Sequence, residues 1–259
     1  MEQYQVGGFD IKLLQNKMLG ILLEIDRICR ENNIRYLLDG GSMLGAVRHH
    51  GFIPWDDDAD VMMPRDDYDR FIEIAPRALG KKYVFQCIEN TREYPYNFGK
   101  VFDTSTEFYE KFTAKLNISH GVYVDVFPMD YVDENYLKQA RMIGHLTMAR
   151  YYKLGISHRA KGLVAKLIPL SVINKIISKK MRYCDNSSPK VCKLCHHGKN
   201  KPPIDISLFN NVIRVEFESA MLPVPAEYNC FLSERYGDYM KLPPIEKRVP
   251  VHQITEVRL

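Results

Sequence analysis

Hydrophobic residues recur at helical spacing near the start of the chain. Positions 11, 14, 18, 21, 22, 25 and 28 are apolar, and the pattern stops at Glu31. This spacing predicts an amphipathic helix that packs one side against a core. Further helices are predicted over 64–79, most of 134–182, and 228–236.

Short apolar runs rich in β-branched and aromatic residues predict strands. These runs are 34–38, 58–63, 83–88, 98–102, 107–112, 122–127 and 212–217. Strands and helices are mixed up to about residue 133, and helical patterns dominate afterwards. We therefore expect an α+β fold, with a mixed-sheet core over 1–133 and a mainly helical elaboration over 134–259.

Composition and charge narrow the class of protein. The chain is 46% hydrophobic and 26% charged, as is typical of a folded globular protein. It has no uninterrupted apolar stretch of about 18 residues, so we expect no transmembrane helix. The first ten residues lack the basic and apolar regions of a secretory signal, which favours a cytoplasmic protein.

The charge is unevenly divided along the chain. Residues 138–201 hold 15 Lys and Arg but one acid, Asp185, whereas seven aspartates lie between 56 and 69. A basic segment of this kind also occurs in proteins that bind nucleic acids, which is the alternative outside the enzymes. Here the lysines alternate with aliphatic residues rather than stacking aromatics, so we expect no nucleic-acid partner.

The acidic run Asp56-Asp57-Asp58-Ala59-Asp60 leads directly into apolar residues. On a strand, Asp58 and Asp60 would share one face about 6–7 Å apart. Like charges at that distance repel, and a divalent cation between them removes the conflict. The pattern predicts a Mg²⁺ or Mn²⁺ site, with a solvated acidic loop as the alternative.

Asp125 is the third candidate ligand, because it lies within the apolar strand 122–127. An unpaired charge there would be costly. If this strand neighbours 58–63, three carboxylates converge and can hold one or two metal ions for phosphoryl transfer. The alternative is a carboxylate satisfied by an arginine or by backbone amides.

Gly40-Gly41-Ser42 is expected to form a tight turn between a strand and a short helix. Glycines let the backbone approach a phosphate, and amides at a helix start favour anions. Gly41 and Ser42 are therefore candidates to position phosphates. The motif is weak by itself and gains weight from its place 16 residues before Asp58.

Together these segments resemble the LicD family, which includes bacterial phosphocholine transferases and is related to fukutin and fukutin-related protein. The resemblance rests on the run from Leu37 to Arg48 and on Gly51-Phe52-Ile53-Pro54-Trp55-Asp56-Asp57-Asp58-Ala59-Asp60. It continues through Pro64 to Tyr68, Val124 to Pro128, and Tyr236 to Arg248.

The resemblance implies a nucleotidyltransferase-like catalytic core with Gly41-Ser42, Asp58, Asp60 and Asp125 in the site. It also implies transfer of a phospho-substituent, with phosphocholine favoured, from a CDP-activated donor such as CDP-choline. The acceptor would be a hydroxyl of a cell-surface glycan such as lipopolysaccharide, teichoic acid or capsule, and CMP would leave.

Several other residues lie in family-like contexts. Arg48, Lys100 and Arg248 are candidates to neutralise the donor pyrophosphate, and His252 is placed to reach the same site. Trp55 is the single tryptophan and is expected to pack near the metal strand. Asp125 is the favoured group to help deprotonate the acceptor hydroxyl.

A cysteine-rich stretch offers a separate structural site. Cys192 and Cys195 have C-x-x-C spacing, and Cys184 with His196 would complete a tetrahedral Zn²⁺ site. Thiols that remain reduced in a loop are the alternative.

The lysine-rich apolar segment 163–181 is compatible with contact to an anionic membrane surface, where lipid-linked glycan acceptors are found. Location at the inner face of the membrane would follow. The alternative is a kinked helix that packs on the core with its lysines in solvent.

Two other enzyme classes fit the acidic motif. A glycosyltransferase could use Asp58 and Asp60 to hold a metal and a nucleotide sugar, and a true nucleotidyltransferase would leave the nucleotide on its product. The transferred group, the acceptor and the oligomeric state stay open at this stage.

Overall fold

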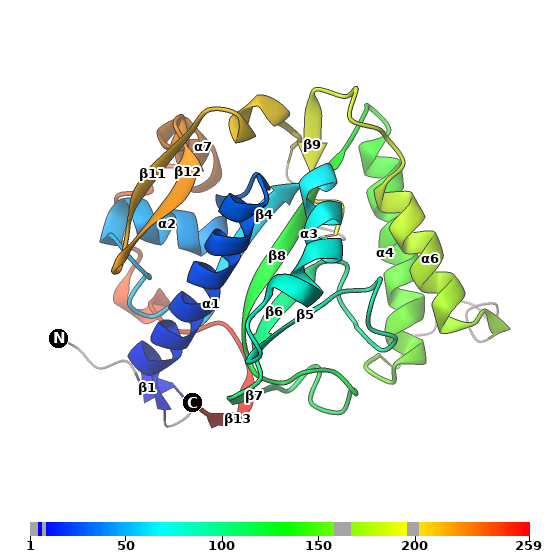
Figure 1. Ribbon diagram of the computed structural model, residues 1–259, viewed down its shortest axis with the longest axis horizontal. Helices are drawn as coiled ribbons and strands as arrows, with labels where there is room; N and C mark the ends of the chain where they lie inside the picture. Colours follow the sequence, from blue (N-terminus) through cyan, green and yellow to red (C-terminus); the bar gives the residue numbers. More distant parts are fainter. Residues whose placement is uncertain (1–4, 7–8, 158–166, 196–201) are drawn as a thin grey trace.

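A seven-stranded mixed sheet forms the centre of the computed structural model, which describes residues 5–6, 9–157, 167–195 and 202–259 (Figure 1). Its main path runs β10-β9-β8-β4-β3, and β6 joins β8 and carries β5. The strands are β3 (Leu37–Leu38), β4 (Asp60–Pro64), β5 (Tyr83–Gln86), β6 (Gly99–Asp103), β8 (Val122–Tyr131), β9 (Lys190–Cys192) and β10 (Ile204–Asp205). The α+β class predicted from the sequence is confirmed.

Strand β8 organises this sheet because three other strands pair with it. It runs parallel to β4 and antiparallel to β6 and β9. All ten of its residues are buried, which explains its nearly continuous apolar sequence. The buried acid Asp125 therefore lies in the middle of the sheet.

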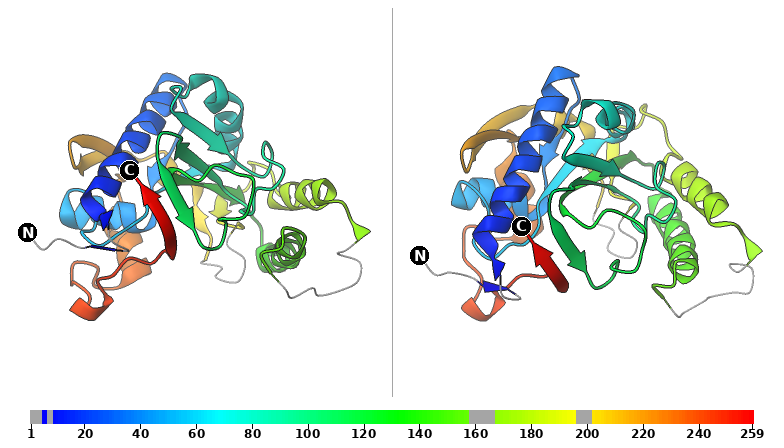
Figure 2. Two further views of the ribbon diagram at one scale, coloured as in Figure 1. Left: turned by 90° about the horizontal axis from the view of Figure 1, so that it is seen from below. Right: turned by 60° about the horizontal axis from the view of Figure 1, so that its bottom comes forward.

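Two helices cover one face of the sheet, as Figures 1 and 2 show. Helix α1 (Ile11–Glu31) buries the periodic apolar residues predicted for it, and Asp10 caps its start through the Lys12 amide at 2.8 Å. Helix α3 (Arg65–Ala78) is tied to β8 by Arg65, whose guanidinium pairs with buried Asp130 at 2.5 Å. These contacts leave the other face of the sheet for the cavity described below.

In the second half of the chain, the described residues are more often helical than extended, as predicted, but they also include short strands besides the predicted one at 212–217. Strands β9 and β10 extend the same sheet across the expected boundary at 133 and 134. Apolar residues near Cys192 and 220–225 pair as strands because their side chains complete neighbouring cores. The remaining described elements are α2 (Gly40–His49), α4 (Tyr136–Lys153), α6 (Leu170–Met181), α7 (Tyr228–Tyr236), β1 (Gln5–Val6), β2 (Phe9–Asp10), β7 (Glu107–Glu110), β11 (Val212–Phe217), β12 (Ala220–Pro225), β13 (Ile254–Arg258) and short 3₁₀ helices at Ile206–Phe209 and Ile245–Lys247.

The lysine-rich segment 163–181 lies only partly within the described residues, because 158–166 are outside them. Its described helix, α6, runs beside α4 (Figure 1) and buries Ile173, Ile177 and Met181. Lys175 and Lys179 are exposed. This packing matches the core-helix alternative, and contact with a membrane stays a prediction. Within the described part of the chain, no helix has the length and apolarity to cross a bilayer.

Candidate active site

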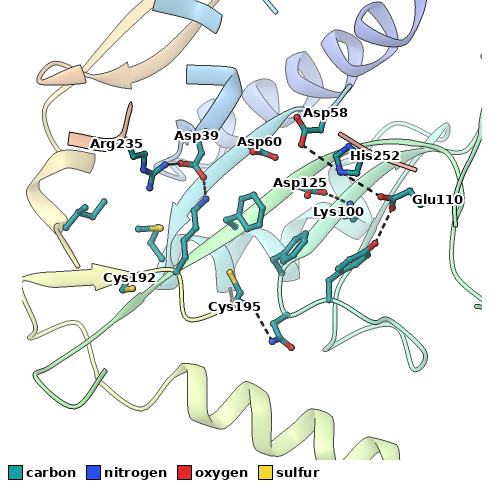
Figure 3. Close-up of a pocket in the computed structure, with 18 of the residues that line it drawn as sticks. Asp39, Asp58, Asp60, Lys100, Glu110, Asp125, Cys192, Cys195, Arg235 and His252 are labelled. Carbon is teal, nitrogen blue, oxygen red and sulfur yellow. Dashed lines mark hydrogen bonds and ion pairs between the residues drawn. The ribbon is translucent and has the colours of Figure 1, made fainter. Parts of the chain in front are cut away.

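A cavity of about 700 Å³ opens where β4, β6 and β8 lie side by side (Figure 3). Asp60 on β4 pairs in register with Asp125 on β8, and Lys100 on β6 pairs with Asp125 from the other side. Three functional side chains are thus aligned across three neighbouring strands. The two acidic strands are thus neighbours, which is the condition under which the sequence predicted that their carboxylates converge.

Asp58 also lines the cavity, but it precedes the strand instead of belonging to it. Strand β4 begins only at Asp60, so the expected alternation of Asp58 and Asp60 along one strand was wrong. The chain before Asp60 is held instead by the Ala59 carbonyl, which accepts the Asp125 amide at 2.9 Å. Both acids nevertheless face the same cavity (Figure 3).

The carboxylates in this region interact strongly with one another. Burial and the charges of Asp58, Asp125 and Asp56 hold the pKa of Asp60 well above its ordinary value. Burial also raises the pKa of Asp125, to about 6, although the Lys100 ammonium lies 2.7 Å from Asp125 Oδ1 and opposes that shift. The repulsion between these acids is the conflict that a bound cation would remove.

The donor chemistry of this acid set suits a hard divalent cation, yet the cage is not preformed. Among the described residues, no three His, Cys, Asp or Glu side chains are arranged around one point as metal ligands. Mg²⁺ commonly takes only one or two protein carboxylates and fills its other positions with water and substrate phosphate. Asp58, Asp60 and Asp125 therefore fit Mg²⁺ chemistry without forming a closed site.

The Gly-Gly-Ser segment supports the acids in a way that the sequence did not reveal. It forms the first turn of α2, and Ser42 is buried, with its hydroxyl accepting the Asp60 amide at 2.9 Å. A Cβ atom on Gly40, whose φ is +54°, would lie 2.8 Å from Asp60 Oδ2. One on Gly41 would lie 2.4 Å from Asp56 Oδ2. The two glycines thus leave space for carboxylates, and Gly41 is not among the residues that line the cavity.

Two cationic side chains that were not predicted from the sequence border the cavity. Arg235 on α7 donates to Asp39 Oδ1 at 2.6 Å, and Lys193 pairs with the other oxygen of the same carboxylate. Asp39 is fully buried at the start of α2. The positive groups are therefore held at the helix N-terminus, where anions are favoured. Their positions in the sequence could have indicated them. Lys193 lies within the C-x-x-C stretch, and Arg235 directly precedes the Tyr236-Gly237-Asp238 motif.

Arg48 and Arg248 do not line this cavity. Arg48 donates to the Tyr239 carbonyl at 2.8 Å, and Arg248 donates to the Pro243 carbonyl at 2.9 Å. The Arg248 guanidinium also lies 5.5 Å from the ring centroid of Trp55. Their predicted contact with a donor pyrophosphate is thus not supported by their placement, whereas Lys100 does border the cavity.

His252 enters the cavity from the C-terminal segment. Its Nδ1 lies 3.1 Å from Asp57 Oδ1, and its Nε2 lies 4.0 Å from Asp58 and 3.9 Å from Glu110. Burial alone would lower the pKa of His252, but the hydrogen bond with Asp57 and the charges of Asp58, Asp57 and Glu110 raise it to about 9. Asp57 also accepts the amides of Val251 and His252, so it fixes this segment to the site.

The cysteines predicted as zinc ligands lie in two places. Cys192 and Cys195 are buried at the cavity, whereas Cys184 borders a separate hollow with Asp133 and Ser188. His196 lies outside the described residues. Burial raises the pKa of both Cys192 and Cys195 to about 12, so their thiols are protonated near neutral pH. Zinc binding stays a prediction.

Comparisons with known proteins support the family resemblance of the segments around the acidic strands. A family model described as LicD/FKTN/FKRP, nucleotidyltransferase domain, matches residues 33–156. Lipopolysaccharide cholinephosphotransferase LicD of Haemophilus influenzae is 32% identical over 253 residues, covering 90% of this chain and 92% of that protein. Uncharacterized proteins of Rickettsia typhi and Rickettsia prowazekii are 39% and 37% identical over 57 and 77 residues, covering 22% and 30% of this chain and 18% and 27% of their own lengths. The chain therefore belongs to the LicD family.

Proposed function

We propose that this protein transfers phosphocholine from CDP-choline to a hydroxyl of a lipopolysaccharide-type glycan and releases CMP with the help of Mg²⁺. The named activity of the Haemophilus influenzae relative supports the transferred group and the acceptor class. The observation that carries the proposal is the register of Asp60 against Asp125 within the cavity, with Asp58 beside them. Carboxylates in this arrangement suit metal-assisted phosphoryl transfer.

Asp58 and Asp60 would hold the cation, with the Asp125 carboxylate beside it. When bound, Mg²⁺ would screen the charge of the donor pyrophosphate and of the developing transition state. Gly40 and Ser42 would then help to position the Asp60 carboxylate. Ser42 does so through the Asp60 amide, and Gly40 through the space it leaves for the Asp60 carboxylate.

Lys193 and Arg235 are placed to bind the CMP part of the donor. Both are held by Asp39 at the N-terminus of α2, so their positive charges are oriented before a substrate arrives. They would stabilise the negative charge that builds up on CMP when the bond from phosphorus to the bridging oxygen breaks. Preorganised cations of this kind supply electrostatic catalysis.

Asp125 is the group proposed to take the proton from the acceptor hydroxyl. Its Oδ1 pairs with Lys100 at 2.7 Å, which orients the carboxylate and leaves its second oxygen for the incoming hydroxyl. The acceptor oxygen then forms the new bond to phosphorus as CMP departs. Neither a glycosidic bond nor pyrophosphate would be produced.

The test is CMP release from CDP-choline in the presence of Mg²⁺, measured with Asp60→Asn and Asp125→Asn. Each variant should lose at least about 100-fold in turnover, because each removes a charge at the reacting group. Circular dichroism should show that both remain folded. Turnover close to that of the parent protein in either variant would refute the assignment.

³¹P NMR of the glycan product separates the other two enzyme classes. A phosphodiester on the acceptor supports the proposal. A product without phosphorus would identify a glycosyltransferase, and release of pyrophosphate would identify a nucleotidyltransferase.

A further inference from the structure

The two ends of the cavity differ in charge. Figure 3 shows Arg235 with Asp39 at one end and Glu110 with His252 at the other, and Asp58, Asp60 and Asp125 lie between them. The end at Arg235 offers cations to phosphate oxygens, whereas the end at Glu110 offers a carboxylate. A donor that carries an anion at one end and a cation at the other would have one favourable orientation.

Aromatic rings surround the Glu110 end. The Tyr96 hydroxyl donates to Glu110 Oε2 at 3.2 Å, and Tyr96 and Tyr151 both line the cavity. Phe112 connects them, with ring centroids 6.2 Å from Tyr96 and 5.3 Å from Tyr151. Two aromatic rings and one carboxylate therefore line this part of the cavity, and Phe112 packs against both rings. Such a wall attracts a cation through the ring faces and through the negative charge.

The Glu110 carboxylate has little compensating charge near it. Among the described residues, the only cationic group within 4.0 Å is His252 at 3.9 Å, and His252 is itself bound to Asp57 at 3.1 Å. The side chain of Glu110 is only 14% exposed, so water screens it weakly. This position favours a positively charged partner from outside the chain.

Resting on the function proposed above, we infer that Glu110, Tyr96 and Tyr151 form the subsite for the quaternary ammonium group of the donor. The methyl groups would contact the rings of Tyr96 and Tyr151, and the positive charge would face Glu110. The subsite would thus distinguish a trimethylated onium both from a primary ammonium and from an uncharged group of the same shape.

The other aromatic rings that line the cavity, Phe98 and Phe127, are less suited because each already has a lysine nearby. The Lys193 ammonium lies 3.9 Å from the centroid of Phe127, and the Lys100 ammonium lies 5.7 Å from that of Phe98. An onium there would meet a like charge. Lys100 is also 4.7 Å from the centroid of Tyr96, but its charge is paired with Asp125 at 2.7 Å. The Glu110 end is therefore the better place for a second cation.

The experiment compares three donors with the full-length protein and Mg²⁺. They are CDP-choline, CDP-ethanolamine and the uncharged analogue in which carbon replaces the choline nitrogen. For the parent protein, kcat/KM for CMP release should be about 10-fold higher with CDP-choline than with the uncharged analogue, given the strength of a partly desolvated cation–π contact. CDP-ethanolamine keeps the charge but lacks the three methyl groups, and each methyl group that becomes fully buried on an aromatic wall adds roughly fourfold to the preference for CDP-choline.

Glu110→Gln and Tyr151→Leu should each reduce the preference for CDP-choline over the uncharged analogue to about threefold or less. Tyr151→Phe keeps the ring and should restore the preference. Tyr152→Leu is the matched control on the next position of α4, because Tyr152 does not line the cavity and should leave the preference unchanged. Thermal unfolding of each variant checks that it is folded.

Two failures can be told apart. If the parent protein releases CMP from CDP-choline and from the uncharged analogue with equal kcat/KM, the subsite is refuted while the proposed function stands. The same holds if Tyr151→Leu and Glu110→Gln both keep the full preference. If none of the three donors yields CMP, the proposed function itself is refuted, and the inference with it.

Discussion

Replacing Ser42 by alanine is expected to destabilise the protein and to slow catalysis through Asp60. In the structure the Ser42 hydroxyl is 3% exposed and accepts the Asp60 amide at 2.9 Å. Asp60 is the first residue of β4 and one of the proposed metal ligands. The variant removes this acceptor from a buried backbone amide and loosens the start of the strand.

The size of the effect follows from the cost of an unsatisfied buried donor. Removing one partner of a buried hydrogen bond costs about 1–3 kcal/mol. For a chain of 150–250 residues, 1 kcal/mol lowers Tm by roughly 2–4 °C, so Ser42→Ala should lower Tm by several degrees. The loss in kcat should exceed the rise in donor KM, because the displaced group acts on the reacting centre.

Differential scanning calorimetry and steady-state CMP release provide the two measurements. Ser42→Thr keeps the hydroxyl and is the conservative comparison, although its added methyl group must fit a buried site. The alternative is that Ser42 binds the donor phosphates directly, as the sequence suggested. An unchanged Tm together with a raised donor KM and an unchanged kcat would support that alternative and refute the structural explanation.

Three further changes test the charges around the cavity. Arg235→Met should lower kcat/KM for the donor about 10- to 100-fold, since hydrogen bonds to charged groups contribute about 1.5–3 kcal/mol. Lys100→Met should lower the Tm of the metal-free protein, and added Mg²⁺ should raise that Tm more than in the parent, because Asp125 loses its buried partner. In EDTA, His252→Gln should remove a pH-dependent part of the unfolding free energy, which denaturant titration at several pH values measures.

The sign of the His252 effect follows from its pKa of about 9 in the folded protein, compared with an ordinary value of 6.5. The stabilisation from Asp57 should be fully present below pH 6.5 and should be lost as the pH rises towards 9. Its upper limit is about 3 kcal/mol. A parent and variant whose unfolding free energies change in parallel over this range would contradict the pairing.

Arg235→Met and Lys100→Met each have a result that would contradict the prediction. A donor kcat/KM unchanged in Arg235→Met would exclude this arginine from donor binding. A metal-free Tm equal to that of the parent in Lys100→Met would show that the ion pair with Asp125 contributes no net stability.

The acidic centre could be predicted because its determinants are local in sequence. Burying an aspartate within an apolar strand is unfavourable whichever element the strand packs against. Asp125 and Asp60 can therefore be recognised as unusual residues without a structure. Parallel pairing then brings them into register. Helices α1 and α7 were predictable for a similar reason, because the residues that determine each helix lie within one short segment.

The remaining parts of the site depend on contacts between distant segments. Arg235 meets Asp39 across 196 positions of the chain, and Lys193 reaches the same carboxylate from the end of β9. The hydrophobic periodicity of a single segment does not indicate such a long-range contact. Arg48 shows the converse, because its place beside the motif suggested a phosphate contact, whereas its guanidinium donates to the Tyr239 carbonyl.

The uneven charge of the sequence has a physical basis in these long-range pairs. Residues of the basic segment neutralise acids elsewhere, as Lys193 does for Asp39 and Arg182 does for Asp69. Among the described acids at the cavity, Asp58 and Asp60 are less well compensated, and their pKa values are raised first by burial and also by neighbouring carboxylates. The fold therefore concentrates unneutralised charge at one place on the sheet. A cation bound there would relieve the repulsion and serve the reaction at once, so metal binding should raise stability and activity over the same range of metal concentration.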